Sequence, residues 1–215
     1  KLKGTYIKIN NKTNNITNSV TPLTFILDTK NKDISSILKE DISSGAERAI
    51  KKAMKNNLKV EITNSKKEIT KFYPIYCRKM QEFGSKPNSL KSIINLLKNK
   101  GYKLFNIYFK NKVIAGGTMI ISKNKITNHL ASSKREYLKY SPNNFLYYQM
   151  IIFAKKNKLR FVDYGPSLKF DKVAKFKESM GGKSTPFEEH IILNKTNYFI
   201  LNFLSLFILK IKRII

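Results

Sequence analysis

The residues best suited to chemistry follow a predicted strand late in the chain. The strand ends at Tyr164, and the sequence predicts a turn at Gly165-Pro166. Ser167 comes next, and a short lysine-rich helix then carries Lys177. Open α/β folds bind ligands at the carboxyl ends of their strands, so these side chains should meet at one sheet edge. A phenol, a hydroxyl and an ammonium group in one place suit the transfer of an acyl group.

Two of these residues are predicted to be catalytic. When an amine attacks a thioester or ester, negative charge builds on the carbonyl oxygen, and a fixed cation beside it lowers the barrier. Lys177 is the predicted cation, acting on this oxyanion or on a phosphate. Tyr164 is predicted to donate a proton to the leaving group or to hydrogen-bond the substrate. The structural alternatives are one more solvated lysine on a basic helix and an aromatic residue that ends a strand.

The composition describes a folded and strongly basic chain. Its 215 residues are 41% hydrophobic, which is enough for one good core, and 42 Lys+Arg against 14 Asp+Glu give a net charge of +28. Such a charge attracts RNA, DNA, anionic lipid headgroups or phosphorylated substrates. A genome-wide drift toward Lys, Asn and Ile would produce the same excess of lysine, and the sequence leaves both explanations open.

The cysteine and histidine content bounds the chemistry further. The single cysteine, Cys77, lies in an apolar helical pattern, so it is expected in or beside the core. One thiol excludes an intramolecular disulfide framework and fits a reducing, cytoplasmic compartment. His129 and His190 stand far apart without a Cys/His cluster, so no metal site is predicted.

The first part of the chain alternates strand and helix signals. Residues 24–28 read as a strand, and Asp33 is a good N-cap for the helix that follows it. Gly45 is expected to interrupt this helix before a basic helix over residues 47–54. Residues 58–62 then alternate as a strand.

The later elements are clearer. Amphipathic spacing predicts helices over 67–83 and 89–98, and hairpin-length turns join three strands at 104–109, 113–121 and 126–131. From Pro142 to Ala154 a helix is apolar almost all round, so it should be buried. The remaining expected elements are a strand over 159–164 in a parallel pair, a helix over 173–180 and a last strand over 187–193.

This order of elements, with four short motifs, resembles the FemAB-like branch of the GNAT superfamily, which includes the peptidoglycan-bridge aminoacyl transferases. The motifs are residues 48–53 on the basic helix, 129–133 at a strand end, 141–148 opening the buried helix, and 163–167 with Phe176-Lys177 and Gly181-Gly182. The resemblance implies an α/β (α+β) fold: a GNAT-like mixed sheet with an antiparallel meander, a buried crossover helix and splayed parallel strands.

The resemblance also implies a reaction, the transfer of an acyl or aminoacyl group to an amine. The donor is acyl-CoA in some members and aminoacyl-tRNA in others, and the expected acceptor is a small-molecule or lipid-linked amine of a sugar or cell-envelope precursor. A Phe-Lys pair lies at the reaction centre of the aminoacyl transferases, and here it matches Phe176-Lys177. The long helical hairpin that often accompanies tRNA use has no room in this chain, which favours a small-molecule donor.

The predicted binding residues surround the same edge. The first turn of the helix at Pro142 offers unpaired N–H groups and the positive end of the helix dipole to an anion. The segment before it lacks the glycine-rich loop of most GNAT enzymes, which weakens the case for CoA. His129 is a candidate base, or else a hydrogen-bonded sheet histidine. The substrate- and donor-binding residues predicted are Ser132, Lys134, Arg135, Pro142, Asn143, Asn144, Tyr147, Gly165, Ser167 and Phe176.

Three regions are expected along the chain. Residues 1–30 resemble the tail of a truncated first GNAT-like domain, since family members usually carry two in tandem, and the chain begins at Lys1 without a signal peptide. Residues 31–193 form the predicted acyltransferase domain. Residues 194–215 form a basic and apolar helix that would pack on the domain or bind the anionic surface of the inner membrane.

Two hypotheses without catalysis are also compatible with the sequence. A basic RNA- or DNA-binding module fits the charge, although no recognised nucleic-acid motif is present and the aromatic residues sit in apolar runs. A degenerate transferase domain retained as a scaffold fits the truncated tandem.

Overall fold

A computed structural model describes residues 5–8, 22–168, 171–186 and 190–193. Residues 22–185 form one compact unit, which contains the candidate site. The residues before and after it form a second unit, in which β1 (Thr5–Lys8) pairs antiparallel with β9 (His190–Leu193).

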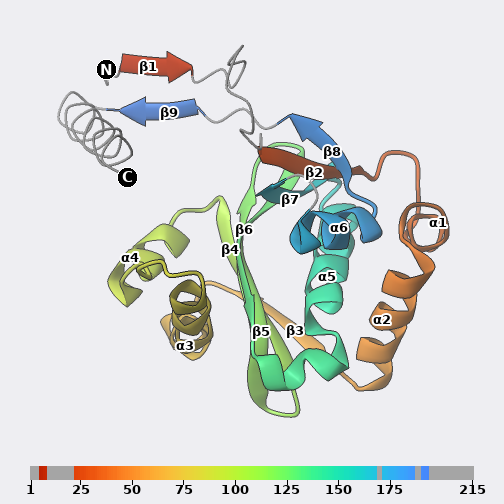
Figure 1. The fold of residues 1–215 in the computed structure, drawn as a ribbon, viewed down its shortest axis with the longest axis horizontal. Coiled ribbons are helices and arrows are strands. Elements are labelled where there is room, and N and C mark those ends of the chain that lie inside the picture. Colours follow the sequence, from red (N-terminus) through yellow and green to blue (C-terminus); the bar gives the residue numbers. More distant parts are fainter. Residues whose placement is uncertain (1–4, 9–21, 169–170, 187–189, 194–215) are drawn as a thin grey trace, which may run out of the picture. The chain divides into compact units, whose positions relative to one another are not determined.

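The compact unit is built on a seven-stranded mixed sheet with the strand order β3-β4-β5-β6-β7-β2-β8 (Figure 1). Strands β3 to β6 form an antiparallel meander, β6 and β7 pair in parallel, and β7 pairs antiparallel with β2. The strands are β2 (Pro22–Asp28), β3 (Lys59–Thr63), β4 (Tyr102–Phe109), β5 (Lys112–Ile121), β6 (Lys125–Ser133), β7 (Phe161–Leu168) and β8 (Lys183–Pro186). The predicted fold class is confirmed.

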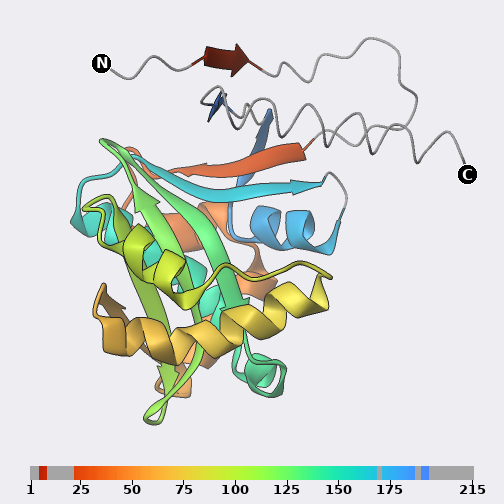
Figure 2. The same ribbon diagram turned by 90° about the vertical axis from the view of Figure 1, so that its left-hand side faces the viewer.

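Helices cover both faces of this sheet (Figures 1 and 2). On one face lie α3 (Lys66–Glu82) and α4 (Leu90–Leu97), and on the other lies the crossover helix α5 (Pro142–Lys156), against which α2 (Ser44–Lys55) packs. The other helical segments are α1 (Ile34–Ser36), the π-helix η1 (Ile37–Asp41), the 3-10 helix η2 (Arg135–Tyr140) and α6 (Lys172–Ser179), which contacts β7 and β2.

Buried side chains on both faces hold these layers together. Along β4, Leu104 joins the cluster under α3 and α4, whereas Phe105 and Ile107 join the cluster under α5. Successive residues of a strand point to opposite faces, so a strand covered on both sides buries consecutive apolar residues. The helix predicted to be apolar all round, α5, is buried between the sheet and α2, which confirms that prediction.

Local capping explains where several helices begin. Asp33 accepts a hydrogen bond from the Ser36 amide, as the sequence predicts. The predicted break at Gly45 is wrong: Gly45 lies inside α2, and the chain breaks at Ile42 instead. The Ser43 side chain caps α2 by accepting from the Ala46 amide, which satisfies a free donor of the first turn.

The chain does not turn at Gly165-Pro166, which corrects a second prediction. Strand β7 continues through both residues to Leu168, with Pro166 opposite Thr24 of β2. The β2–β7 register shifts between Thr24 and Ile26, and a proline fits a strand at such an irregularity.

The ends of the compact unit also differ from expectation. Because Pro22–Asp28 pairs with β7, the unit begins at Pro22 rather than near residue 31. The single last strand expected over 187–193 is replaced by β8 and β9, and residues 187–189 lie outside the described part. The predicted helix over 194–215 also lies outside it. Among the described helices, none has the length and apolar character needed to span a membrane.

Two glycines should respond in opposite ways to alanine. A Cβ on Gly116 would lie 2.8 Å from the Phe105 carbonyl oxygen and 2.9 Å from the Phe72 ring, so Gly116→Ala should lower the free energy of unfolding by about 1–3 kcal/mol. A Cβ on Gly45 meets nothing within 4 Å, and Gly45→Ala should raise it by about 0.5–1 kcal/mol. Urea unfolding measures both, and equal effects would contradict the packing described.

Candidate active site

Strands β6 and β7 separate after a short stretch of parallel pairing. Only Lys125 to Thr127 of β6 pair with β7, opposite Phe161 to Asp163. Beyond this point β6 runs on to Ser133 beside β5, while β7 continues to Leu168 beside β2. In the described part of the chain, β6 therefore has no strand partner on this side after Thr127.

Two local features accompany the separation. Thr118 of β5 pairs with Leu130 and the next residue of β5, Met119, pairs with Asn128, so His129 is an extra residue of β6. Such a bulge bends its strand and increases the local twist. On β7, Gly165 has φ +78° and a Cβ there would lie 2.8 Å from the Asn128 carbonyl oxygen. Glycine therefore allows a last close approach between the strands before they diverge.

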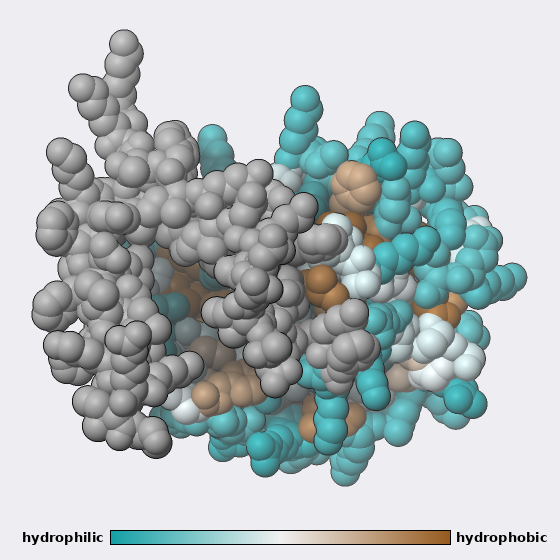
Figure 3. Space-filling model, turned by 45° about the horizontal axis from the view of Figure 1, so that its top comes forward, coloured by the Kyte–Doolittle hydropathy of each residue, from teal (hydrophilic) through white to brown (hydrophobic). Residues whose placement is uncertain are grey.

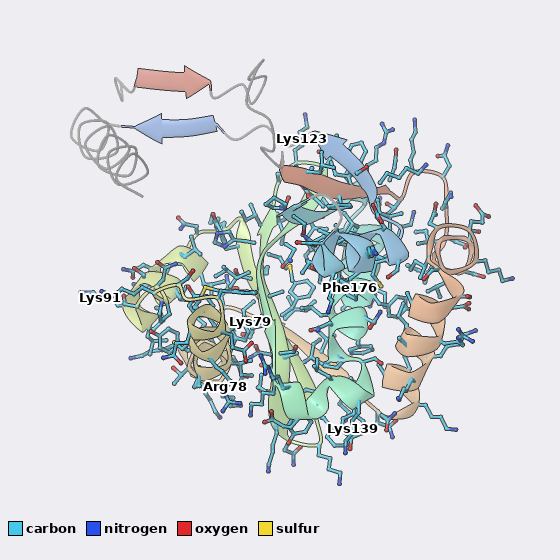
Figure 4. All side chains as sticks on the ribbon, viewed as in Figure 1. Arg78, Lys79, Lys91, Lys123, Lys139 and Phe176 are labelled. Carbon is cyan, nitrogen blue, oxygen red and sulfur yellow. The ribbon has the colours of Figure 1, made fainter. Side chains whose placement is uncertain are left out.

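A pocket of about 560 Å³ lies along the free edge of β6. Its lining comes from the end of α3, from β6, η2, the start of α5, β7 and α6. The lining residues are Lys79, Met80, Glu82, Phe83, Asn128, His129, Leu130, Ala131, Ser132, Ser133, Arg135, Leu138, Asn143, Tyr147, Pro166, Lys172, Val173, Phe176 and Lys177. Figure 4 labels two of them from opposite walls, Lys79 on α3 and Phe176 on α6.

The ammonium group of Lys177 lies inside this site and is bound to β7. The residue is 3% exposed, and its Nζ donates to the Gly165 carbonyl at 2.9 Å, the Pro166 carbonyl at 2.8 Å and the Ser167 hydroxyl at 2.7 Å. Desolvation lowers its pKa from 10.5 to about 8. An ammonium group has three hydrogens, so the protonated side chain commits all of them to the parted segment of β7.

Three aromatic residues, from α5, β7 and α6, pack against one another. The Tyr147 ring lies 4.9 Å from that of Tyr164 and 5.0 Å from that of Phe176, measured between centroids. Tyr164 is fully buried and donates its hydroxyl proton to the Met180 carbonyl at 2.8 Å. It does not line the pocket. This geometry does not support the predicted proton donor: the Tyr164 hydroxyl ties β7 to the end of α6.

Polar groups on the pocket wall retain unused hydrogen-bonding capacity. The Asn128 Nδ2 group donates to the Tyr147 hydroxyl at 3.1 Å, while Asn128 Oδ1 is buried and has no partner among the described residues. The hydroxyl of Ser132, a residue 4% exposed, is also buried and finds no partner in the part of the chain that the structure describes. Burial raises the pKa of Tyr147, so its phenol stays protonated. Unpaired buried polar groups are costly in a protein, and a ligand that pairs with them gains affinity.

Charged residues surround the outer part of the pocket. Glu82 at the end of α3 pairs with Arg135 of η2 at 3.1 Å and with Lys79 at 3.2 Å, and these contacts lower the pKa of its carboxyl group. Lys172 adds a further cation. The first turn of α5 follows Ser141, whose side chain makes no capping hydrogen bond, and its Asn143 lines the pocket. The surface visible in Figure 3 is also largely hydrophilic, with small separate apolar areas.

The structure brings some of the predicted site residues to the pocket and places the others outside its lining. The predicted residues that line the pocket are Ser132, Arg135, Asn143, Tyr147, Phe176 and Lys177, and the candidate base His129 lines it too. Gly165 and Ser167 contact Lys177 rather than the pocket. Three others make internal contacts: the Lys134 amide donates to the Ile114 carbonyl, Asn144 reaches Met180, and Pro142 is buried at the start of α5.

His129 also has the structural partners expected of a sheet histidine. Its Nδ1 lies 3.3 Å from the Thr118 hydroxyl, and its ring meets that of Tyr102 edge to face. Partial burial lowers its pKa, so the imidazole is mainly neutral near pH 7.

Sequence reasoning missed two parts of the wall. The end of α3 contributes Lys79, Glu82 and Phe83. Phe83, an exposed aromatic residue beside the helix end, was the feature of the sequence that could have indicated this part of the wall. Asn128 carried no signal, because its importance comes from contact with Tyr147, which is distant in the sequence.

Comparison with known proteins places the chain in a family. The family model described as an acetyltransferase (GNAT) domain matches residues 45–178, more than half of the chain. The chain belongs to the GNAT acetyltransferase family. The matched residues contain the crossover helix, both parted strands and the Phe176-Lys177 pair. The described GNAT domain is therefore an acyltransferase domain, as predicted.

Solved structures extend this result to the fold. The crystal structure of FemX has a TM-score of 0.67 at 14% identity, covering 83% of this chain and 63% of that one. L-PGS from Bacillus licheniformis has a TM-score of 0.60 at 10% identity, covering 92% of this chain and 65% of that one. The likeness to FemX confirms the predicted FemAB-like GNAT fold. The chain spans less than two thirds of the length of these solved chains. No curated protein shows significant similarity to it.

Removing the Tyr164 hydroxyl should affect stability rather than catalysis. Tyr164→Phe leaves the Met180 carbonyl without its buried donor, so the free energy of unfolding should fall by about 1–3 kcal/mol. Because the hydroxyl does not line the pocket, turnover at saturating substrate should stay within about threefold of wild type. Urea unfolding and steady-state kinetics measure the two effects, and a large loss of turnover with unchanged stability would restore the catalytic role.

Proposed function

We propose that this GNAT domain transfers an acyl or aminoacyl group to the amino group of a sugar or cell-envelope precursor. The observation that carries the proposal is the pocket on the free edge of β6, beside which the desolvated ammonium group of Lys177, a residue of α6, is hydrogen-bonded to β7. Membership of the GNAT family supports acyl transfer, and the FemAB-like fold supports an acceptor from the cell envelope.

The proposed donor is acyl-CoA. The cations Lys79, Arg135 and Lys172 line the pocket and would bind phosphates, together with the N–H groups of the first turn of α5. The unpartnered Ser132 hydroxyl, on the free edge of β6, would hydrogen-bond the amide-rich arm of CoA. Phe176 and Tyr147 would form the apolar wall beside the acyl group.

The reaction needs no reactant beyond the acyl donor and the acceptor amine. The amine nitrogen attacks the acyl carbon, and the carbonyl electrons move onto its oxygen. When the tetrahedral intermediate collapses, the bond to sulfur breaks and the thiolate leaves, while the amine loses one proton and the thiolate gains one. The Lys177 charge lies near the point where β6 and β7 part and would stabilise the negative intermediate through space.

A second candidate donor is aminoacyl-tRNA. The charge of +28 and the FemAB-like fold favour it, because a polyanion would bind a basic surface. With either donor the acceptor would be an amine, and the reacting carbonyl would belong to a thioester in acyl-CoA or to an ester in aminoacyl-tRNA. A membrane-bound acceptor would also suit the charge through anionic headgroups.

Ligand-induced stabilisation tests the donor. Acetyl-CoA at 100 times its Kd should stabilise the folded state by about 2.7 kcal/mol and raise Tm, because it binds only the folded protein. Deacylated tRNA should give the smaller shift. A shift with tRNA alone would select the second donor, whereas RNA binding that falls steeply with salt, without turnover of either donor, would favour a non-catalytic RNA-binding module.

Lys177→Ala should lower turnover by about tenfold or more, because it removes a buried charge that would stabilise the negative intermediate through space. Lys175→Ala is the matched control, since Lys175 is an exposed lysine of the same helix outside the pocket lining. Turnover near the wild-type value in Lys177→Ala would remove this residue from the mechanism.

The pH dependence should follow the lowered pKa of Lys177. The side chain is charged below about pH 8 and neutral above it, so wild-type turnover should decline as the pH rises through about 8. The unfolded chain keeps this proton up to about 10.5, so the native state binds fewer protons between these values. Relative to Lys177→Ala, the wild-type free energy of unfolding should therefore rise with pH across this window. A flat difference would contradict the desolvation of Lys177.

A further inference from the structure

The position of Lys177 leaves one catalytic requirement unmet. Its three hydrogens go to Gly165, Pro166 and Ser167 of its own chain, so its charge acts on the reacting oxygen only through space. The developing oxyanion of an acyl transfer gains most from a donor in direct contact, and loss of one such donor typically costs about 10²–10³-fold in rate.

Tyr147 has a hydroxyl proton available in the pocket. It lies on α5, is 5% exposed and lines the pocket. Its oxygen accepts a hydrogen bond from Asn128 Nδ2 at 3.1 Å, and within the described residues its own proton has no acceptor. This arrangement differs from that of Tyr164, whose proton goes to the Met180 carbonyl.

Tyr147 lies where strands β6 and β7 separate. Its partner Asn128 is the first residue of β6 after the last pair with β7, that between Thr127 and Asp163. The ring of Tyr147 is held between those of Tyr164 and Phe176. Side chains on either side of the parting point therefore fix the phenol, which a preorganised donor requires.

We propose that the Tyr147 hydroxyl donates to the acyl carbonyl oxygen as negative charge develops on it, and that Asn128 positions this hydroxyl. Tyr147 is thus a catalytic residue and Asn128 a positioning residue. The hydrogen bond that Asn128 donates to the phenol oxygen increases the polarity of the O–H group. Burial raises the pKa of Tyr147, so the group acts as a neutral donor at working pH. The proposal rests on the proposed acyl transfer, but it holds for either donor, because a thioester and an ester both react through a tetrahedral oxyanion.

Ser132 is also a buried hydroxyl residue of the pocket wall, with no hydrogen-bond partner among the described residues, and it belongs to a different part of the site. It lies four residues beyond Asn128, toward the end of β6 and the segment with Arg135. A group there is suited to the donor's arm rather than its carbonyl. Ser132 should therefore affect donor binding, whereas Tyr147 should affect the chemical step.

The test compares Tyr147→Phe with Tyr148→Phe. Tyr148 is the next residue of the same helix, it is buried to a similar degree, and it is absent from the pocket lining. Turnover is followed with the donor that the wild type consumes, acetyl-CoA or alanyl-tRNA, and with hydroxylamine as a surrogate amine. Tyr147→Phe should lower kcat about 10²-fold with the donor KM within about threefold, while Tyr148→Phe stays within about twofold of wild type.

Two further variants separate positioning from binding. Asn128→Ala should lower kcat, and combining it with Tyr147→Phe should cause no further loss, because Asn128 acts through the phenol. Ser132→Ala should raise the donor KM and leave kcat nearly unchanged. Thermal unfolding of each variant identifies any loss that comes from misfolding.

The outcomes distinguish this inference from the proposed function. If the wild type is active and folded Tyr147→Phe has an undiminished kcat, the role of Tyr147 is rejected and the acyl-transfer proposal stands. Losses in Tyr147→Phe and Asn128→Ala that multiply in the double variant reject the positioning role of Asn128. A wild-type protein that consumes neither donor overturns the acyl-transfer proposal, and this inference with it.

Discussion

The candidate site depends on the separation of two parallel strands, and one buried lysine is tied to that separation. Strands β6 and β7 pair over three residues and then diverge. Lys177 binds the diverging segment of β7 through Gly165, Pro166 and Ser167. A buried charge is costly unless it is hydrogen-bonded, and here three oxygens satisfy it. The same contacts that make the ammonium group tolerable keep this part of β7 in place.

The surrounding packing makes that separation stable. The bulge at His129 bends β6, and Gly165 allows the last close approach of the two strands. The rings of Tyr147 and Tyr164 are buried, and the Tyr147 ring also contacts that of Phe176, so aromatic packing joins α5, β7 and α6. The pocket is thus a consequence of how the sheet is built.

The polar groups of the site divide into those with partners and those without. Lys177 and Tyr164 give their hydrogens to main-chain and side-chain oxygens of the chain, and they hold the structure. Ser132 and the Asn128–Tyr147 pair keep unused hydrogen-bonding capacity at the pocket wall. The residues with unused capacity line the pocket, whereas Tyr164, the tyrosine favoured by the sequence, does not. Residue type alone does not separate these groups, because the distinction is which partner each proton reaches.

The sequence by itself determined most of the element order, the GNAT fold class and the place of Phe176-Lys177 beside the sheet edge where the pocket lies. Helical and strand periodicities, the Asp33 cap and the apolar run of α5 are local patterns, so they can be read without coordinates. Tertiary structure alone decided that β7 continues past Gly165-Pro166, because β2 supplies its partner from more than a hundred residues away. It also decided that Asn128 meets Tyr147 and that the Tyr164 proton faces inward, since hydrogen-bond partners distant in sequence are fixed only by packing.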